Sequence, residues 1–145
     1  MPTQPSSAGA VDSTDALATL HAQMQDMMEH SSTRVAFLLA SPGNRRSTAN
    51  GGYDFAAFDK MVRNPSYAPL LAKGKYEVLN HRQVGSQFAA TVKLVLANGS
   101  TRKYQFVMSL IPPEVEDMNP SLAPYQLRRG HPPCWRTDSV MPSRY

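Results

Sequence analysis

Residues 88–111 carry the pattern that most restricts the fold of this chain. Apolar and polar side chains alternate through residues 88–97 and again through residues 102–111, and Asn98-Gly99 lies between the two segments. A period of two is typical of strands that bury one face, and Asn-Gly favours a tight turn. We therefore predict a β-hairpin with one apolar face.

The length of the turn decides which residues face one another across this hairpin. A three-residue loop of residues 98–100 would place Leu94 opposite Tyr104, so that both strands present apolar side chains to the same face. A two-residue loop would place Leu94 opposite Lys103 and mix the two faces. We expect the three-residue loop, and a five-residue loop, which keeps the same faces, is the second choice.

A helical pattern begins near residue 13. Ser13 or Thr14 can cap a helix that runs to about His30, and Asp15 would lie favourably in its first turn. Apolar residues recur there at helical spacing, which predicts one amphipathic helix. They are Leu17, Leu20, Met24, Met27 and Met28.

Two shorter helices are predicted before the hairpin. Residues 35–39 form a buried segment that ends at Pro42, because proline removes a backbone donor. Residues 55–62 carry a second apolar stripe, and residues 67–71 form a turn that leads back to the core. The stripe consists of Phe55, Phe58, Met61 and Val62.

Strand character flanks the hairpin on both sides. Tyr76, Val78 and Asn80 are expected to share one face of a first strand, and residues 134–141 resemble a last strand. Helices followed by antiparallel strands indicate an α+β fold, with the N-terminal helices over one face of the sheet.

The chain divides into one domain and three segments of different character. Residues 1–12 are rich in Pro, Ser and Ala and are predicted to form a flexible arm, residues 13–141 form the single domain, and residues 142–145 are a C-terminal tail. Inside the domain, residues 112–133 form a Pro-rich insertion that is too long for an ordinary hairpin loop. Such an insertion is either functional or held by a partner.

Charge and composition exclude several classes of protein. The net charge is +4, yet residues 1–30 contain four acidic side chains and no Lys or Arg. The basic residues elsewhere are dispersed, so we do not expect a nucleic-acid-binding surface. Nucleic-acid binding is therefore the weakest of the three functional hypotheses that we consider.

No apolar run approaches the ~20 residues of a membrane span, and no signal or targeting segment is visible. We expect an intracellular protein.

No motif in the sequence specifies a metal, a cofactor or a covalent mechanism. Cys134 is the only cysteine, and four histidines lie on separate predicted elements at no metal-ligand spacing. Cys134 and Trp135 are interpreted as buried parts of the last strand, where a free cysteine behaves as a small hydrophobe. We therefore expect no metal and no cofactor.

Three stretches of the sequence carry distinctive combinations of residues: AFLLASPGNRR (residues 36–46), FDKMVRNPSYAPLL (residues 58–71) and CWRTDSV (residues 134–140). Together they resemble an uncharacterised family of the nuclear-transport-factor-2-like superfamily. The family motifs are F-x-x-ASP-x-NR, F-x-x-MVR-x-P-x-Y-x-P-L and CW-x-x-DGV, and Ser139 stands where the last motif has glycine. The resemblance covers about residues 15–141, whereas the insertion looks expanded and the arm has no counterpart.

The resemblance implies a cone-shaped α+β fold in which a curved sheet wraps a long helix and often leaves a cavity. It implies no single activity, because the superfamily hosts isomerases, dehydratases, transport factors and non-enzymatic subunits. An isomerase-like site would need one carboxylate and a tyrosine inside the cone. The candidates are Asp138 with Tyr76 or Tyr104, although strand alternation puts Asp138 on the face opposite Trp135.

The favoured hypothesis is a non-enzymatic accessory or scaffolding subunit of a larger protein assembly. It would dock through the N-terminal arm and the insertion, and we expect the assembly in a mitochondrion or plastid. The alternative is a small-molecule-binding protein or an isomerase- or dehydratase-like enzyme that uses the cone cavity. The predicted partner-binding residues are Val115, Met118, Leu122, Tyr125, Leu127, Arg128 and Arg129.

Overall fold

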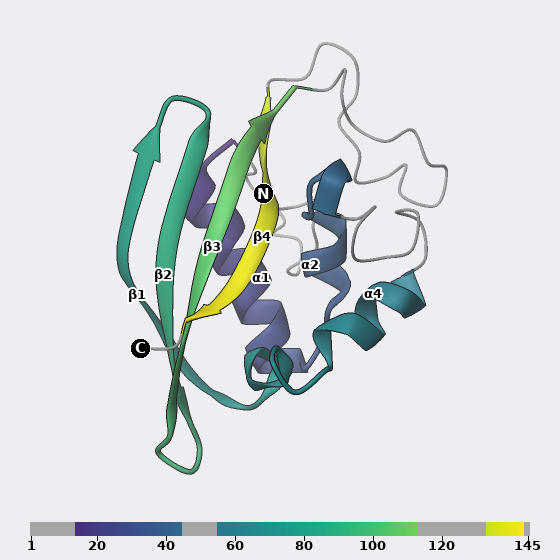
Figure 1. Cartoon of the computed structure of the whole chain (residues 1–145), viewed down its shortest axis with the longest axis vertical. Helices are drawn as coiled ribbons and strands as arrows, with labels where there is room; N and C mark the ends of the chain where they lie inside the picture. The colour runs from purple at the N-terminus through teal and green to yellow at the C-terminus, as the bar shows by residue number, and fades with distance from the viewer. Residues whose placement is uncertain (1–13, 45–54, 113–132, 144–145) are drawn as a thin grey trace, which may run out of the picture.

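The computed structural model describes residues 14–44, 55–112 and 133–143, and its elements follow the predicted order. Figure 1 shows α1 behind the strands and α2 and α4 beside β4. The sheet is antiparallel and open, with the strand order β1-β2-β3-β4. The α+β prediction is thus confirmed. The elements are α1 (Ala16–His30), α2 (Arg34–Leu38), α4 (Phe55–Val62), η2 (Ala68–Leu71), β1 (Gly74–Val84), β2 (Gln87–Leu96), β3 (Thr101–Ile111) and β4 (Cys134–Ser143).

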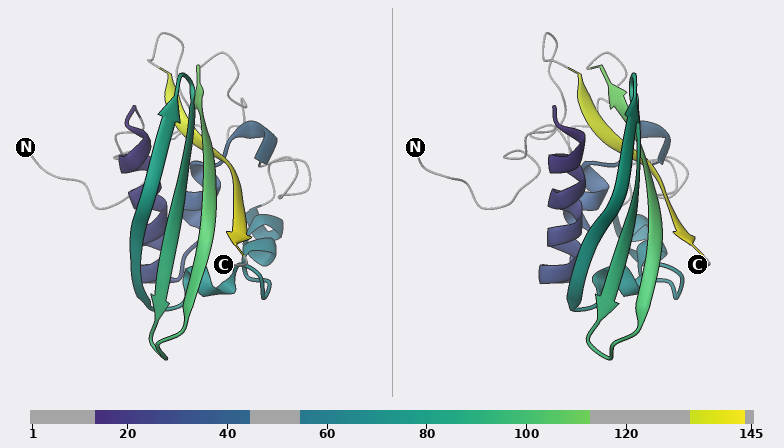
Figure 2. Two further views of the ribbon diagram at one scale, coloured as in Figure 1. Left: turned by 60° about the vertical axis from the view of Figure 1, so that its left-hand side comes forward. Right: turned by 90° about the vertical axis from the view of Figure 1, so that its left-hand side faces the viewer.

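The long helix α1 forms because its apolar residues fall on one side at helical spacing. Leu20, Met24, Met27 and Met28 are buried, and the two views in Figure 2 show α1 lying along one face of the sheet. Asp15 occupies the N-cap position itself, so the predicted cap at Ser13 or Thr14 is wrong by one residue or two. None of the helices in the described segments has the length and apolar character needed to cross a membrane.

The start of α2 is stabilised by a side chain from α1. The backbone N–H of Val35 donates to Asp26 Oδ2 over 3.2 Å, and Asp26 is itself buried. An N-terminal helix turn has backbone donors without intrahelical partners, and a carboxylate from the preceding helix satisfies one of them. The predicted helix at residues 35–39 is confirmed, and both of its ends lie one residue earlier in the structure.

The hairpin of β2 and β3 has the predicted faces but a different register. Gly99 N–H donates to the Leu96 carbonyl over 2.9 Å, and Leu96 N–H donates to the Ser100 carbonyl over 2.9 Å. The loop therefore consists of residues 97–99, one position earlier than predicted. Val92 then lies opposite Tyr104, and the predicted pairing of Leu94 with that tyrosine is wrong.

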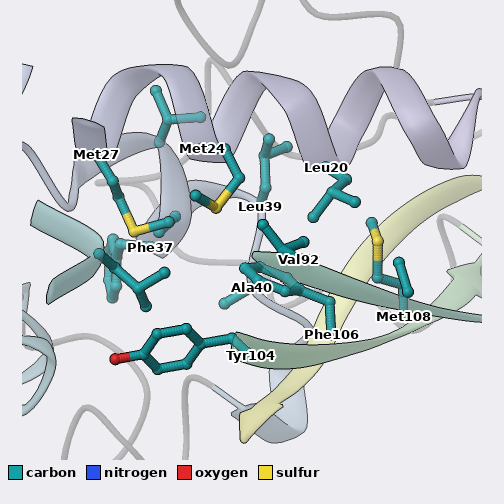
Figure 3. Packing of buried hydrophobic residues seen from close by; sticks show 14 of the residues in the cluster. Leu20, Met24, Met27, Phe37, Leu39, Ala40, Val92, Tyr104, Phe106 and Met108 are labelled. Atoms are coloured by element: carbon teal, nitrogen blue, oxygen red, sulfur yellow. The ribbon is translucent and has the colours of Figure 1, made fainter. Parts of the chain in front are cut away.

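The odd number of loop residues preserves the separation of the two faces. The apolar side chains of both strands remain on the helix-covered face, where Figure 3 shows Val92 and Met108 pointing toward α1 and the Tyr104 ring extending along the sheet. Gly99 has φ +86°, the left-handed conformation that a three-residue hairpin loop requires at its last position.

A bulge interrupts each outer strand, at Leu79 in β1 and at Asp138 in β4. In β1 the register shifts between Val78 and Asn80, so Tyr76 and Val78 face the core and Asn80 pairs with Thr91 on the other face. The prediction that Asn80 shares their face is therefore wrong. The residue in the bulge, Leu79, remains 41% exposed. A bulge of this kind adds one residue to one strand and reverses the alternation beyond it.

The last strand, β4, buries its first half. Trp135 lies opposite Leu110, is 3% exposed and meets the Phe88 ring edge-on at 6.2 Å between centroids. Cys134 is 2% exposed on the opposite face, so the interpretation of both residues as buried parts of a strand is confirmed.

The outer edge of β4 is covered by the segment that follows α2. Ser41 N–H donates to the Thr137 carbonyl over 2.8 Å, and Thr137 N–H donates to the Leu39 carbonyl over 2.9 Å. These two bonds form a short parallel bridge centred on Ala40. They satisfy backbone groups that an edge strand would otherwise leave unpaired.

We predict that Trp135→Ala lowers the free energy of unfolding by about 3–5 kcal/mol, because it leaves a large void in the core. Denaturant unfolding followed by circular dichroism measures the loss without relying on tryptophan fluorescence. Met141→Ala is the control on the same strand, since Met141 is 57% exposed; it should change stability by about 0.5 kcal/mol or less. Equal losses in the two variants would contradict the packing described for Trp135.

We also predict that Gly99→Val destabilises the hairpin by about 1–2 kcal/mol, because a residue with a Cβ is disfavoured at positive φ. Gly99→Asn should cost clearly less, since asparagine tolerates the left-handed region better than other residues. Thermal and denaturant unfolding of both variants provide the comparison. The conformational explanation fails if valine and asparagine at residue 99 have the same effect.

Candidate functional site

A cavity of about 250 Å³ lies between the helices and the C-terminal half of the sheet. Its walls come from α1, α2, α4 and η2 on one side and from β3 and β4 on the other. The lining residues are Gln23, Met27, Ala36, Asn44, Phe58, Met61, Val62, Tyr67, Leu70, Phe106, Thr137, Asp138, Ser139, Val140 and Met141.

Most of the cavity wall is apolar, and part of it is buried. Met27 and Phe58 approach from the helices, and Phe106 approaches from the centre of β3. Each of these three side chains is at most 4% exposed. A largely apolar wall of this kind favours molecules that gain by leaving water.

Hydrogen bonds between helical segments hold α4 in place as one wall. Thr33 Oγ1 donates to Asp59 Oδ1 over 2.7 Å, and Arg63 bridges Asp59 to the Ser31 carbonyl. These contacts fix α4 against the turn between α1 and α2, while Phe58 packs on the ring of Phe37 at 5.2 Å. The cavity is therefore bounded by a supported helix.

Two exposed methionines stand at the boundary of the cavity. Met61 on α4 is 46% exposed and Met141 on β4 is 57% exposed, yet both line it. The sequence placed Met61 in the apolar stripe of its helix, and the structure leaves it at the surface. Flexible thioether side chains adapt readily to the shape of whatever they contact.

A buried amide and a buried hydroxyl form the polar part of the wall. Gln23 projects from α1 and Thr137 from β4, and they are 1% and 2% exposed. Gln23 Nε2 lies 2.7 Å from Thr137 Oγ1, and Oε1 of the same amide lies 3.0 Å from it. The parallel bridge at Ala40 fixes the backbone of Thr137, so the hydroxyl has a defined position.

Asn44 adds a second amide beside this pair. Its Nδ2 donates to the Thr137 carbonyl over 3.0 Å, and its backbone N–H donates to Ser41 Oγ over 3.2 Å. The residue belongs to the sequence stretch on which the family resemblance partly rests. Its role in this structure is to bind the backbone of β4 at the edge of the cavity.

The predicted catalytic residues do not form a constellation. Asp138 lines the cavity at the bulge in β4, but its carboxylate accepts a hydrogen bond from Ser109, which alternates with the core-facing Met108. Tyr104 is buried and donates to the Ser66 carbonyl over 2.7 Å. Tyr76 lies on β1, at the opposite edge of the sheet from β4, and its hydroxyl is 2.7 Å from His21 Nδ1.

Both tyrosines are held in the neutral form. Burial raises the pKa of Tyr104, with a nearby Arg102 acting in the opposite direction. Burial also raises the pKa of Tyr76, and the negative charge of Glu29 raises it further. Neither hydroxyl is therefore prepared to act as a base near neutral pH.

The predicted docking residues, from Val115 to Arg129, and the N-terminal arm lie outside the described residues. Within the described ranges, no group of three or more His, Cys, Asp or Glu side chains is placed to hold a metal ion. The polar pair that does line the cavity, Gln23 and Thr137, was not singled out from the sequence. The available signal was a glutamine on the apolar side of an amphipathic helix.

The raised tyrosine pKa values predict a loss of stability at alkaline pH. A group that holds its proton more tightly in the folded state stabilises that state below its unfolded pKa, near 10, and this contribution disappears as the pH rises through the folded pKa. Tyr104→Phe should cost about 1 kcal/mol at neutral pH through the lost bond to Ser66. Its unfolding free energy should then fall less than that of the wild type between about pH 9 and pH 11. Parallel alkaline profiles for the two proteins would contradict this assignment.

Comparison with known proteins finds no relative of this chain. No protein-family model, no curated protein and no solved structure matches it. Its function is therefore inferred from the geometry of the cavity.

Proposed function

We propose that this protein is a small-molecule-binding domain of the nuclear-transport-factor-2-like type, and that the cavity beside β4 is its binding site. The observation that carries the proposal is the cavity itself, an apolar space with a buried polar pair at one part of its wall. A concave apolar site with a few fixed polar groups is the usual form of a ligand pocket in proteins.

The size of the cavity defines the size of the ligand. At about 250 Å³ it exceeds the ~150 Å³ of an engineered cavity that binds benzene and falls below the ~300 Å³ where drug-sized pockets begin. A single aromatic ring or a small bicyclic molecule suits that volume. The exposed Met61 and Met141 provide an adaptable surface through which such a molecule would enter.

The family part of the proposal is supported by the arrangement of the elements. The described parts of the three stretches that resemble the family lie around the cavity: residues 36–44 and 58–71 contribute to α2, α4 and η2, and residues 134–140 contribute to β4. A long helix lies along the sheet, and the cavity lies between helices and sheet, as the resemblance implies.

Binding is favoured over proton-transfer catalysis by the chemistry of the lining. The fixed polar groups are an amide and a hydroxyl, Gln23 and Thr137, which do not titrate near neutral pH. The one lining carboxylate, Asp138, is engaged by Ser109. The role as an accessory subunit in a mitochondrial or plastid assembly stays a prediction, because it depends on the arm and the insertion.

The test is a titration with toluene, phenol and indole, followed through the methyl signals of Met27, Ala36 and Val140. At least one probe should bind with a dissociation constant of about 1 mM or tighter, which needs only ~0.6 kcal/mol per non-hydrogen atom for a seven-atom probe. Val140→Phe should fill the cavity and abolish the shifts.

Val95→Phe is the matched control for this experiment. It makes the same change on β2, where Val95 pairs with Thr101, is 40% exposed and does not line the cavity. That variant should bind the probes like the wild type. The proposal is wrong if no probe shifts these methyl signals, or if Val140→Phe binds them as well as Val95→Phe does.

A further inference from the structure

We propose that the cavity selects neutral molecules that donate a hydrogen bond, such as a phenol, a small alcohol or an N–H heterocycle. The donor group would lie against Gln23 Oε1 and Thr137 Oγ1, and the apolar body would lie against the rest of the wall. This inference rests on the proposed function and specifies the class of ligand.

The orientation of the Gln23 amide follows from its neighbour on α1. Gln23 Nε2 lies 3.3 Å from the carbonyl oxygen of Thr19, one helical turn earlier. A carbonyl oxygen can only accept, so the amide nitrogen must be the atom that faces it. The oxygen Oε1 is thereby directed away from the helix backbone.

The donors of the polar pair are all used within the protein. Gln23 Nε2 has two hydrogens, and its two partners are the Thr19 carbonyl and Thr137 Oγ1. The Thr137 hydroxyl has one hydrogen, and its acceptor is Gln23 Oε1 at 3.0 Å. A ligand that offers only an acceptor would therefore find no donor in this pair.

Acceptor capacity remains on both oxygens. An amide oxygen and a hydroxyl oxygen each carry two lone pairs, and each of these atoms has one donor among the described residues. Both side chains are almost fully buried, at 1% and 2% exposure. Each oxygen can therefore accept one further hydrogen bond, and a hydroxyl or N–H group of a ligand in the cavity would supply it.

The remainder of the lining argues for a neutral ligand. No Lys, Arg or His belongs to the lining set that the described chain supplies, so nothing there offsets the desolvation of a carboxylate or phosphate. The lining carboxylate of Asp138 is held by Ser109 and would repel such anions. The Gln23–Thr137 pair therefore accepts hydrogen bonds, and the described lining offers no positive charge to an anion.

Three probes of nearly equal size separate the possibilities. Phenol donates a hydrogen bond, toluene makes none, and benzonitrile only accepts. With the wild-type protein, calorimetric or ligand-observed titration should show phenol binding roughly 2- to 10-fold tighter than toluene, the range expected for one net hydrogen bond. Benzonitrile should bind no more tightly than toluene.

A double variant tests whether Gln23 and Thr137 cause the preference. Gln23→Met with Thr137→Val replaces both polar groups by side chains of similar shape, and removing both partners together is less damaging than removing one. The phenol preference should disappear while toluene binding is retained. Gln105→Met is the matched control, because Gln105 is exposed on the opposite face of β3; it should keep the preference.

The outcomes distinguish this inference from the proposed function. If none of the three probes binds the wild type, the proposed function fails and the inference with it. If toluene or benzonitrile binds as tightly as phenol, the cavity is a binding site but the donor selection is wrong. Should the double variant not fold, the side-chain amide signals of Gln23 in the wild type must shift with phenol and not with toluene, and equal shifts overturn the inference.

Discussion

Thr137 is the residue at which the helices and the sheet of this protein are joined. Its backbone N–H and carbonyl pair with Leu39 and Ser41 beyond α2, and its hydroxyl meets Gln23 on α1. A backbone bridge and a buried side-chain bond at one position connect three segments that are far apart in the chain. The position of β4 relative to the helices, and with it the shape of the cavity, depends on this junction.

The core provides the energy that holds this junction closed. The apolar side of α1 packs on the inner face of β2 and β3, where Leu20, Met24, Val92 and Phe106 are fully buried. A buried side chain of this size contributes about 1.5–3 kcal/mol relative to the exposed state. Because the junction lies inside this packing, its hydrogen bonds are shielded from competing water.

The cavity follows from a mismatch between the two layers at the edge of the sheet. Over β2 the helix α1 packs directly on the sheet, whereas beside β4 the shorter elements α2, α4 and η2 complete the wall together with α1. The bulge at Asp138 turns that carboxylate toward Ser109 and keeps Val140 on the inner face. The space that remains is mostly apolar, and the buried pair of Gln23 and Thr137 gives the site its proposed chemistry.

The set of elements and the faces they bury could be predicted from the sequence alone. The spacing of apolar residues was sufficient for α1, and the alternation around Asn98-Gly99 was sufficient for the faces of the hairpin, because both patterns are local. The register of β2 on β3 was not predictable. A loop at residues 97–99 and a loop at residues 98–100 bury the same faces and differ only in which residues lie opposite one another. The bulges at Leu79 and Asp138 were also missed.

The sequence could not identify the candidate site either, because Gln23 and Thr137 are 114 residues apart and neither belongs to a motif. Only the packing of α1 against β4 brings this amide and this hydroxyl together, since their contact depends on long-range tertiary structure that no local pattern encodes.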